Sequence, residues 1–192
     1  MRRSPASHDR IYRPHQLLFK SLSNWRRAGS KISIEMRKRQ ISTTPPTAPP
    51  SGHAWLDVER TALIEVTSEE NGYPIESALL GAENQGWRAV NPGTQTIRLI
   101  FDEPQKLRRI WLVFEDSENT RTQEFVLRWS PDTGNSFREI VRQQWNFSSP
   151  GSVREVEDYA VELSDVTVLE LIIVPDMSGG AARASLASLR LA

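Results

Sequence analysis

Side chains able to carry covalent chemistry are scarce in this 192-residue chain. It contains no cysteine and three histidines, His8, His15 and His53, which excludes a thiolate nucleophile and a cysteine-based zinc site. We expect His53, at the end of a proline-rich stretch, to be exposed and without catalytic duty. Neighbouring acids such as Glu69 and Glu70 fall in predicted loops and are expected to be solvated. The sequence has no phosphate-binding or dinucleotide-binding glycine motif. We therefore predict a protein that is not an enzyme and holds no cofactor.

Residues 130–137 (SPDTGNSF) fit the Asp-box pattern S-x-D-x-G-x-x-aromatic. The pattern is typical of hairpins in sialidase propellers. Asp132 can accept hydrogen bonds from amides of its own turn, Gly134 can take a positive φ, and Phe137 can close the hairpin. A single copy in a chain without repeats does not make a propeller. We predict a structural role for Asp132.

The formal net charge of zero conceals two oppositely charged parts. Residues 1–50 hold 11 basic and two acidic side chains, a net charge of +9, and residues 51–192 hold 13 basic and 22 acidic ones, a net charge of −9. Four prolines in residues 42–52 predict an extended linker. We therefore predict a disordered basic tail over residues 1–52, followed by a folded domain over residues 53–192.

Three interpretations of the tail stay open. Met36 is a plausible alternative start, so that residues 1–35 would be upstream sequence. Otherwise the tail is disordered without a specific role, or its amphipathic segment around Leu18, Leu22 and Trp25 serves in targeting or surface binding. No apolar run reaches the length of a transmembrane helix or a signal peptide, so we expect a cytoplasmic protein.

The domain shows apolar residues at every second position, in short runs separated by turn residues. Ile97, Leu99 and Phe101 are one such set. We predict an all-β fold, an eight-stranded antiparallel jelly-roll or Greek-key β-sandwich, with one helical turn near residues 74–81. The predicted strands are residues 60–67, 95–101, 109–115, 122–129, 136–147, 153–163, 166–174 and 183–191. Tight turns are expected at Pro104, Gly134 and Asp165.

Three segments in this order resemble the discoidin, or galactose-binding-like, β-sandwich domain, which includes many carbohydrate-binding modules. They are ALLG at residues 78–81 with GWR at 86–88, then QTIRLIF at 95–101 leading to the strand at 109–114, and then the strand and hairpin at 125–137. The resemblance implies a core role for Trp87. It also implies a non-catalytic binding module with a carbohydrate ligand. Ser188 stands where many family members place a carboxylate that binds calcium, which argues against a structural calcium ion and leads us to predict no metal site.

Alternating strand directions place every second loop at the same end of the sandwich. Loops 68–94, 115–121, 147–152 and 175–182 should therefore lie together. Sugars are bound by aromatic stacking and by polar groups that satisfy the hydroxyls, and these loops supply both. The predicted ligand-binding residues are Asn71, Tyr73, Asn119, Arg121, Trp145, Asn146 and Asp176.

A second surface predicts a different function. In the segment 110–114, Ile110, Leu112 and Phe114 share one face and Trp111 and Val113 the other. If the first face is buried, Trp111 and Val113 form an outward apolar patch, which marks a protein interface or lies under another segment such as the arm around Trp55. The alternative function is thus an intracellular protein-interaction or assembly domain that uses Trp111 or the loop end of the sandwich as its interface. Nucleic acid is a disfavoured partner, because the domain's charge of −9 would repel phosphates.

Overall fold

The computed structural model describes residues 48–50, 52, 54–80 and 86–192, which belong to the unit Ser42–Ala192. The predicted tail over residues 1–52 and the alternative start at Met36 lie almost wholly outside the described residues. Those predictions, and the domain boundary at residue 53, stay predictions. Within the described part of the chain, no helix has the length and apolar character needed to cross a membrane.

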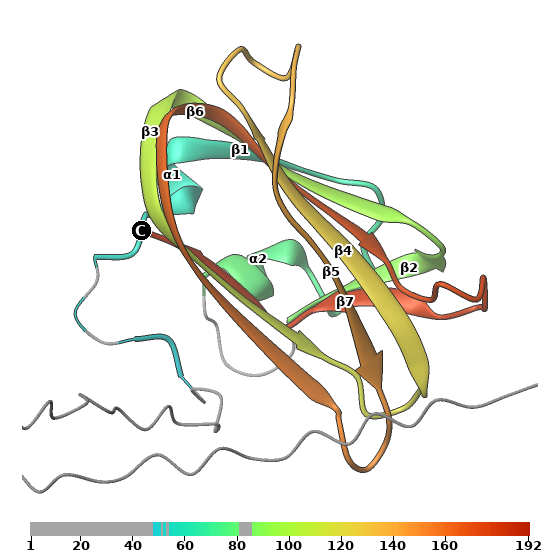
Figure 1. Cartoon of the computed structure of the whole chain (residues 1–192). Coiled ribbons are helices and arrows are strands. Elements are labelled where there is room, and N and C mark those ends of the chain that lie inside the picture. Colours follow the sequence, from blue (N-terminus) through green and yellow to red (C-terminus); the bar gives the residue numbers. More distant parts are fainter. Residues whose placement is uncertain (1–47, 51, 53, 81–85) are drawn as a thin grey trace, which may run out of the picture. The chain divides into compact units, whose positions relative to one another are not determined.

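Strands dominate the described domain, which confirms the predicted all-β class (Figure 1). Two short helices accompany them, α1 (Val58–Thr61) and α2 (Ile75–Leu79). The second coincides with the predicted helical turn. The strands are β1 (Ala62–Val66), β2 (Trp87–Pro92), β3 (Gln95–Glu115), β4 (Arg121–Ser130), β5 (Arg138–Phe147), β6 (Arg154–Val174), β7 (Arg183–Leu186) and β8 (Ser188–Leu191).

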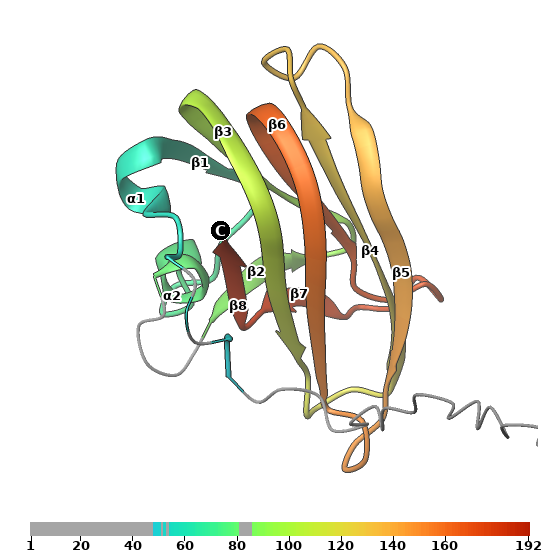
Figure 2. The ribbon, with the colours of Figure 1, turned by 60° about the vertical axis from the view of Figure 1, so that its left-hand side comes forward.

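The two longest strands, β3 and β6, pair with each other in antiparallel fashion along their length. Gln95 pairs with Ile173 at one end and Glu115 with Arg154 at the other, with register shifts between Ile100 and Arg109. Such shifts are β-bulges, which bend a strand without ending it. Both strands arch over together, so that each runs through both layers of the sandwich (Figures 1 and 2).

This arch corrects part of the prediction. The four strands expected at residues 95–101, 109–115, 153–163 and 166–174 are two continuous bent strands. Pro104 lies inside β3 within the bulged stretch, where its missing N–H interrupts no regular ladder. Asp165 lies inside β6 with a φ of 59°. The tight turns predicted at both positions are therefore wrong, because the chain bends there while the pairing continues.

The remaining strands attach to this central pair. The main sheet has the order β1-β3-β6-β4-β5, with β8 also paired to β3, and β2 and β7 form a separate two-stranded sheet. The predicted strand at residues 183–191 is split at Ala187, because its halves pair with β2 and β3 respectively. β2 lies within a segment predicted to be a loop. Four predicted strands form the two strands β3 and β6, one predicted strand is divided into β7 and β8, and β2 is additional. The described residues therefore contain eight strands, the number predicted.

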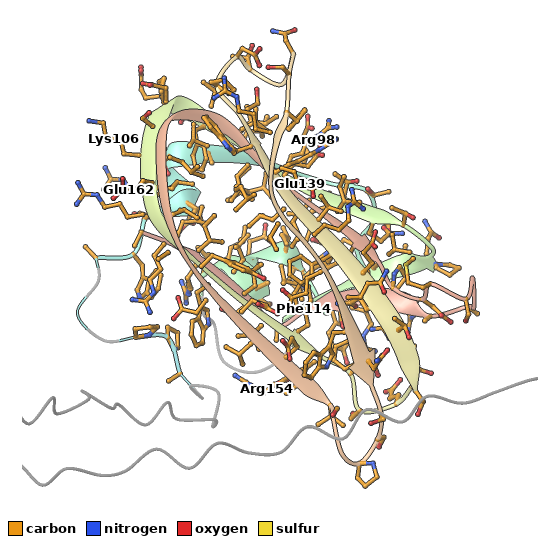
Figure 3. All side chains as sticks on the ribbon, viewed as in Figure 1. Arg98, Lys106, Phe114, Glu139, Arg154 and Glu162 are labelled. Carbon is orange, nitrogen blue, oxygen red and sulfur yellow. The ribbon has the colours of Figure 1, made fainter. Side chains whose placement is uncertain are left out.

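The core lies between the layers and contains the alternating residues that the sequence indicates. Ile97, Leu99 and Phe101 are all buried, and so is Trp87, which confirms its predicted packing role. Phe114 of one layer and Phe125 of the other bring their ring centroids to 5.0 Å, a contact across the sandwich. Side chains fill this space in Figure 3, where Phe114 points inward.

An ionic ladder crosses the outer side of the main sheet. Glu170 of β6 is completely buried and receives hydrogen bonds from Arg98 of β3 and Arg128 of β4. Arg98 reaches on to Glu65 of β1 at 3.6 Å, and the Arg128 guanidinium lies 4.3 Å from the centre of the Phe137 ring. The arginine stems cover the carboxylate, and one acid thereby ties together neighbouring strands of the sheet.

A polar cluster lies on the inner side, between β5 and the first half of β6. Gln143 donates a hydrogen bond to Glu157, and the Tyr159 hydroxyl lies 2.6 Å from Glu157 Oε2. Glu155 is two residues away on the same face of β6. Burial, together with the hydrogen bond and the charge of Glu157, raises the pKa of Glu155 to about 8. The two acids therefore hold a proton between the layers at neutral pH. The sequence predictions did not identify this cluster.

Removing the buried carboxylate should destabilise the domain. We expect Glu170→Gln to lower the free energy of unfolding by about 2–3 kcal/mol, since two arginines lose their shared charged partner. Glu65→Gln, which removes an exposed end of the same ladder, should cost less than about 0.5 kcal/mol. Urea unfolding of the parent and both variants measures the difference, and equal losses for the two would contradict the assignment.

The inner cluster predicts a pH dependence of stability. The folded state holds the Glu155 proton more tightly than the unfolded chain, whose ordinary pKa is 4.5. Its stabilising contribution is therefore complete below pH 4.5 and is lost as the pH rises to about 8. Glu155→Gln should flatten this slope in urea midpoints measured across that range, whereas Glu162→Gln, exposed on the same strand, should keep it. A parental slope in Glu155→Gln would refute the proton assignment.

Candidate functional site

Three of the loops predicted to share one end of the sandwich do meet there. The Asp116 amide donates a 2.9 Å hydrogen bond to the Val153 carbonyl, which joins the β3–β4 and β5–β6 connections. Arg121 extends to the Pro175 carbonyl, which joins the β6–β7 connection to them. The arch of β3 and β6 explains this arrangement, because each bent strand returns its far end to the side from which it started.

Arg121 belongs to the framework of this end and is not free for a ligand. Its side chain is buried, and its Nε lies 2.7 Å from Asp116 Oδ2. Burial opposes ionisation of Asp116, but hydrogen bonds from the Glu118 and Asn119 amides and the charge of Arg121 outweigh it and lower the pKa of Asp116. The pair therefore fixes the 116–119 turn, in which Asn119 is exposed.

The fourth predicted loop, residues 68–94, contributes a charged cluster beside β2 and β7. Arg183 Nη1 lies 2.9 Å from Glu70 Oε1, and Arg88 Nε lies 3.8 Å from Glu70 Oε2. Arg88 also stacks over the Tyr73 ring at 4.3 Å from its centre. Tyr73 is thus half-buried beneath an arginine, while Asn71 is exposed in the preceding turn.

The other three predicted ligand residues point elsewhere. Trp145 packs against the core between the layers. Asn146 faces the opposite way on the same strand, where its Oδ1 accepts a 2.7 Å hydrogen bond from Thr122. The Asp176 carboxylate accepts hydrogen bonds from the amide and hydroxyl of Ser178, which shapes its own turn. The seven predicted residues therefore do not converge on a single point.

The exposed apolar patch predicted at Trp111 and Val113 is not present. Both side chains do point away from Ile110 and Leu112, but they are only 0% and 2% exposed. Pro49 lines a groove together with Trp111 and Val113, and Ala54 lines a second hollow with Arg109 and Asp158 beside them. The arm that precedes β1 therefore lies along this face, as the alternative explanation of the patch anticipates.

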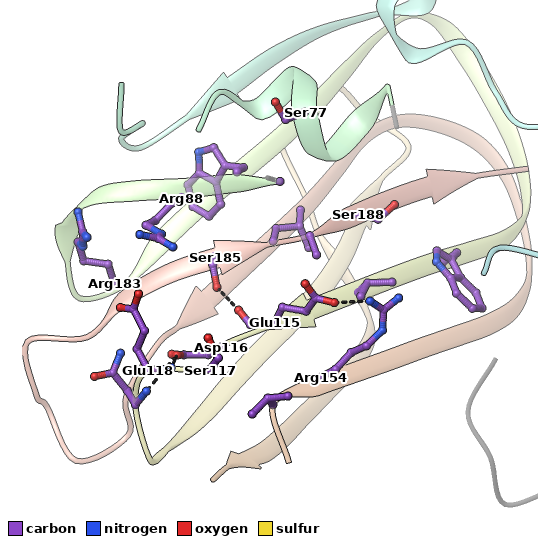
Figure 4. Close-up of a pocket in the computed structure, with 18 of the residues that line it drawn as sticks. Ser77, Arg88, Glu115, Asp116, Ser117, Glu118, Arg154, Arg183, Ser185 and Ser188 are labelled. Atoms are coloured by element: carbon purple, nitrogen blue, oxygen red, sulfur yellow. Dashed lines mark hydrogen bonds and ion pairs between the residues drawn. The ribbon is translucent and has the colours of Figure 1, made fainter. Parts of the chain in front are cut away.

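A groove of about 960 Å³ runs over this outer face. Arg88 and Arg183 reach into it from β2 and β7 on one side, and Asp116, Ser117 and Glu118 border the other side (Figure 4). Its floor is formed by β3 and β8, which contribute Trp111, Val113, Ser188 and Arg190. Asn119 is the predicted ligand residue that lines the groove directly. Arg88 was missed because β2 was not predicted as a strand, and Arg183, which begins the predicted strand 183–191, was missed because its pairing with β2 was not predicted.

Carboxylates in the groove are mostly engaged. Glu115 is paired with Arg154, and Asp116 with Arg121. Among the described residues, no group of three or more histidine, cysteine, aspartate or glutamate side chains could hold a metal ion. The three histidines lie outside the described residues.

The Asp-box segment has the structural role predicted for it. Asp132 accepts hydrogen bonds from the Ser130 hydroxyl at 2.6 Å and from the Ser136 amide at 2.9 Å. Hydrogen bonds from Ser130 and Ser136 lower the pKa of Asp132 to about 2. Thr133 and Gly134 both have positive φ values, so the carboxylate holds a strained turn together.

Comparisons with known proteins found similarity in structure but not in sequence. No family model matches the sequence, and no curated protein matches it significantly. Solved structures do resemble it.

One is the CBM32 of AlyQ in complex with 4,5-unsaturated mannuronic acid, at 16% identity and a TM-score of 0.53, covering 73% of this chain and 98% of that one. A second, CpGH89CBM32-5 from Clostridium perfringens in complex with GalNAc-beta-1,3-galactose, has 21% identity, a TM-score of 0.53 and coverage of 72% and 99%. A third, the family 32 CBM of NanJ from C. perfringens in complex with galactose, has 16% identity, a TM-score of 0.51 and coverage of 68% and 97%.

These neighbours are carbohydrate-binding modules, and the chain matches nearly their whole length. At such low identity the likeness concerns the fold. The chain has the discoidin, or galactose-binding-like, β-sandwich fold that family-32 carbohydrate-binding modules also adopt.

Proposed function

We propose that this protein is a non-catalytic carbohydrate-binding module whose glycan lies in the groove between the β2–β7 pair and the 116–119 turn. The observation that carries the proposal is the groove itself, a hollow of about 960 Å³ bordered by polar and charged side chains. Its volume lies within the range of protein ligand sites. The fold's neighbours include modules in complex with galactose and with GalNAc-beta-1,3-galactose, which supports a sugar as the ligand class.

The chemistry of the groove suits hydroxyl-rich ligands. A sugar hydroxyl left unpaired on binding costs about 1–3 kcal/mol, so a glycan site must offer many donors and acceptors. Arg88 and Arg183 supply donors on one side, and Asn119 supplies both kinds of group on the other. The serines Ser77, Ser117, Ser185 and Ser188 add hydroxyls along its length.

The same groove argues against catalysis. Glycoside hydrolysis uses two carboxyl groups that flank the scissile bond. Glu115 and Asp116 are held by arginines, which leaves Glu118 without a described ion-pair partner. A single exposed acid cannot serve as both the acid and the base or nucleophile. We include neither a metal nor a cofactor in this proposal.

The alternative, a protein-interaction domain, loses the Trp111 and Val113 patch as its interface, since both side chains are buried. Four large hydrophobic side chains are exposed in the described domain, but they are scattered: Leu63 lies in β1, Leu80 directly after α2, Val90 in β2 and Met177 in the β6–β7 connection. Scattered single residues of this kind are normal on protein surfaces. We therefore favour the glycan.

Asn119 and Asn146, both exposed, offer a matched test. Asn119→Ala removes a polar group from the groove, whereas Asn146→Ala removes one from the outer side of the opposite layer. On a glycan array, we expect the parent to retain at least one glycan, Asn119→Ala to bind it about tenfold more weakly, and Asn146→Ala to match the parent. Absence of binding to every glycan would refute the function. Weakening by Asn146→Ala alone would refute the site.

A further inference from the structure

The groove has one cationic side, which begins with two arginines that share a single acid. Arg88 and Arg183 stand on the paired strands β2 and β7 and both turn toward Glu70. Each guanidinium carries five N–H donors, and one carboxylate cannot occupy all ten. Both side chains are about one-third exposed, at 30% and 35%. The pair therefore presents unused donors and a net charge of +1 to the groove.

Arg190 adds a second uncompensated charge on the floor of this side. It lines the groove from β8 and donates a 2.8 Å hydrogen bond to the Leu79 carbonyl. Among the described residues it has no carboxylate partner, and burial lowers the pKa of Arg190. A half-buried cation without a counter-charge is costly, and a ligand that brought an anion would relieve that cost.

The opposite side does not neutralise these arginines. Glu115 and Asp116 are already matched by Arg154 and Arg121, so Glu118 is the remaining acid there. The cationic side is also not a consequence of composition, because residues 51–192 carry a net charge of −9. Arg88, Arg183 and Arg190 thus lie on one side of a groove in a domain whose net charge is negative.

We propose that this side binds the carboxylate of an acidic sugar, a uronic acid residue within a glycan. The inference rests on the proposed function and names its ligand class. Arginine forks match a planar carboxylate with two parallel hydrogen bonds. Arg88 and Arg183 would bind one carboxylate, and Arg190, seven residues beyond Arg183 along β7 and β8, would bind that of another sugar of the same glycan. The sugar ring would then lie toward Asn119 and the serines, which meet its hydroxyls. Salt should weaken the interaction, because part of it is ionic.

The test compares sugars whose carboxyl group is either charged or masked as a methyl ester. Trimers of galacturonate, mannuronate and glucuronate are each titrated calorimetrically into the full-length protein beside their neutral methyl esters. We expect at least one acid to bind about tenfold more tightly than its ester, with an advantage that shrinks as salt is added. Arg183→Gln and Arg190→Gln should each lower the affinity for that acid about tenfold. Arg142→Gln, on the outer side of β5, should bind as the parent does.

The outcomes separate the two proposals. If esters bind as tightly as acids, or if a neutral glycan binds while all three uronates fail, the acidic-sugar inference is overturned and glycan binding stands. If no glycan binds at all, both fall. Thermal melting of each variant checks the fold, and Arg190→Lys, which keeps the charge but loses the fork, should retain affinity between those of the parent and Arg190→Gln. Equal affinities of Arg190→Lys, Arg190→Gln and the parent would remove Arg190 from the site.

Discussion

The antiparallel pairing of β3 with β6 is the constraint on which the other features depend. These strands are 21 residues each and remain paired through a bulged bend, so both layers are built on the same two segments. The bend returns the 115 end of β3 and the 154 end of β6 to the side of the molecule that also holds the β6–β7 connection. Outer charges and inner packing both reinforce this pair, through Glu170 on one side and Phe114 on the other. The groove exists because β8 and the β2–β7 pair then attach beside the returning half of β3.

The layers and the core could be predicted from the sequence because side-chain alternation reports which face of a strand is buried. Alternation does not show whether two successive apolar runs belong to one continuous strand or to two strands. Pro104 and Asp165 have the composition of turns, yet a bulge accommodates each of them within a strand, and only the partner strand decides between the two outcomes. β2 was missed for a related reason. It is short, pairs with β7 alone among the described strands, and ends in Asn91 and Pro92, residues that usually mark a loop.

Prediction of the candidate site was limited because the sequence does not show which partner a side chain contacts, or which way it points, in the folded chain. The rule of alternating loops correctly places three loop connections at one end, but it cannot show that Arg121 forms an ion pair with Asp116. Nor can it show that Trp145 faces inward and Asn146 outward. The outward direction of Trp111 was predictable, whereas its coverage by the preceding arm depends on contacts distant in sequence. Residues of the groove come from six separate segments, and no single motif contains them.

The net charge of the domain and the local charge of the groove have opposite signs. A domain with a net charge of −9 would be expected to repel an anion, yet solvent screening limits such repulsion to about 8 Å at physiological ionic strength. Within that distance, what a ligand experiences in the groove is set by Arg88, Arg183 and Arg190 and by the few acids beside them. Two of those acids are neutralised by neighbouring arginines. Local pairing, and not the sum of charges, therefore decides the sign of the field at the cationic side, which is why net charge alone cannot exclude an acidic ligand.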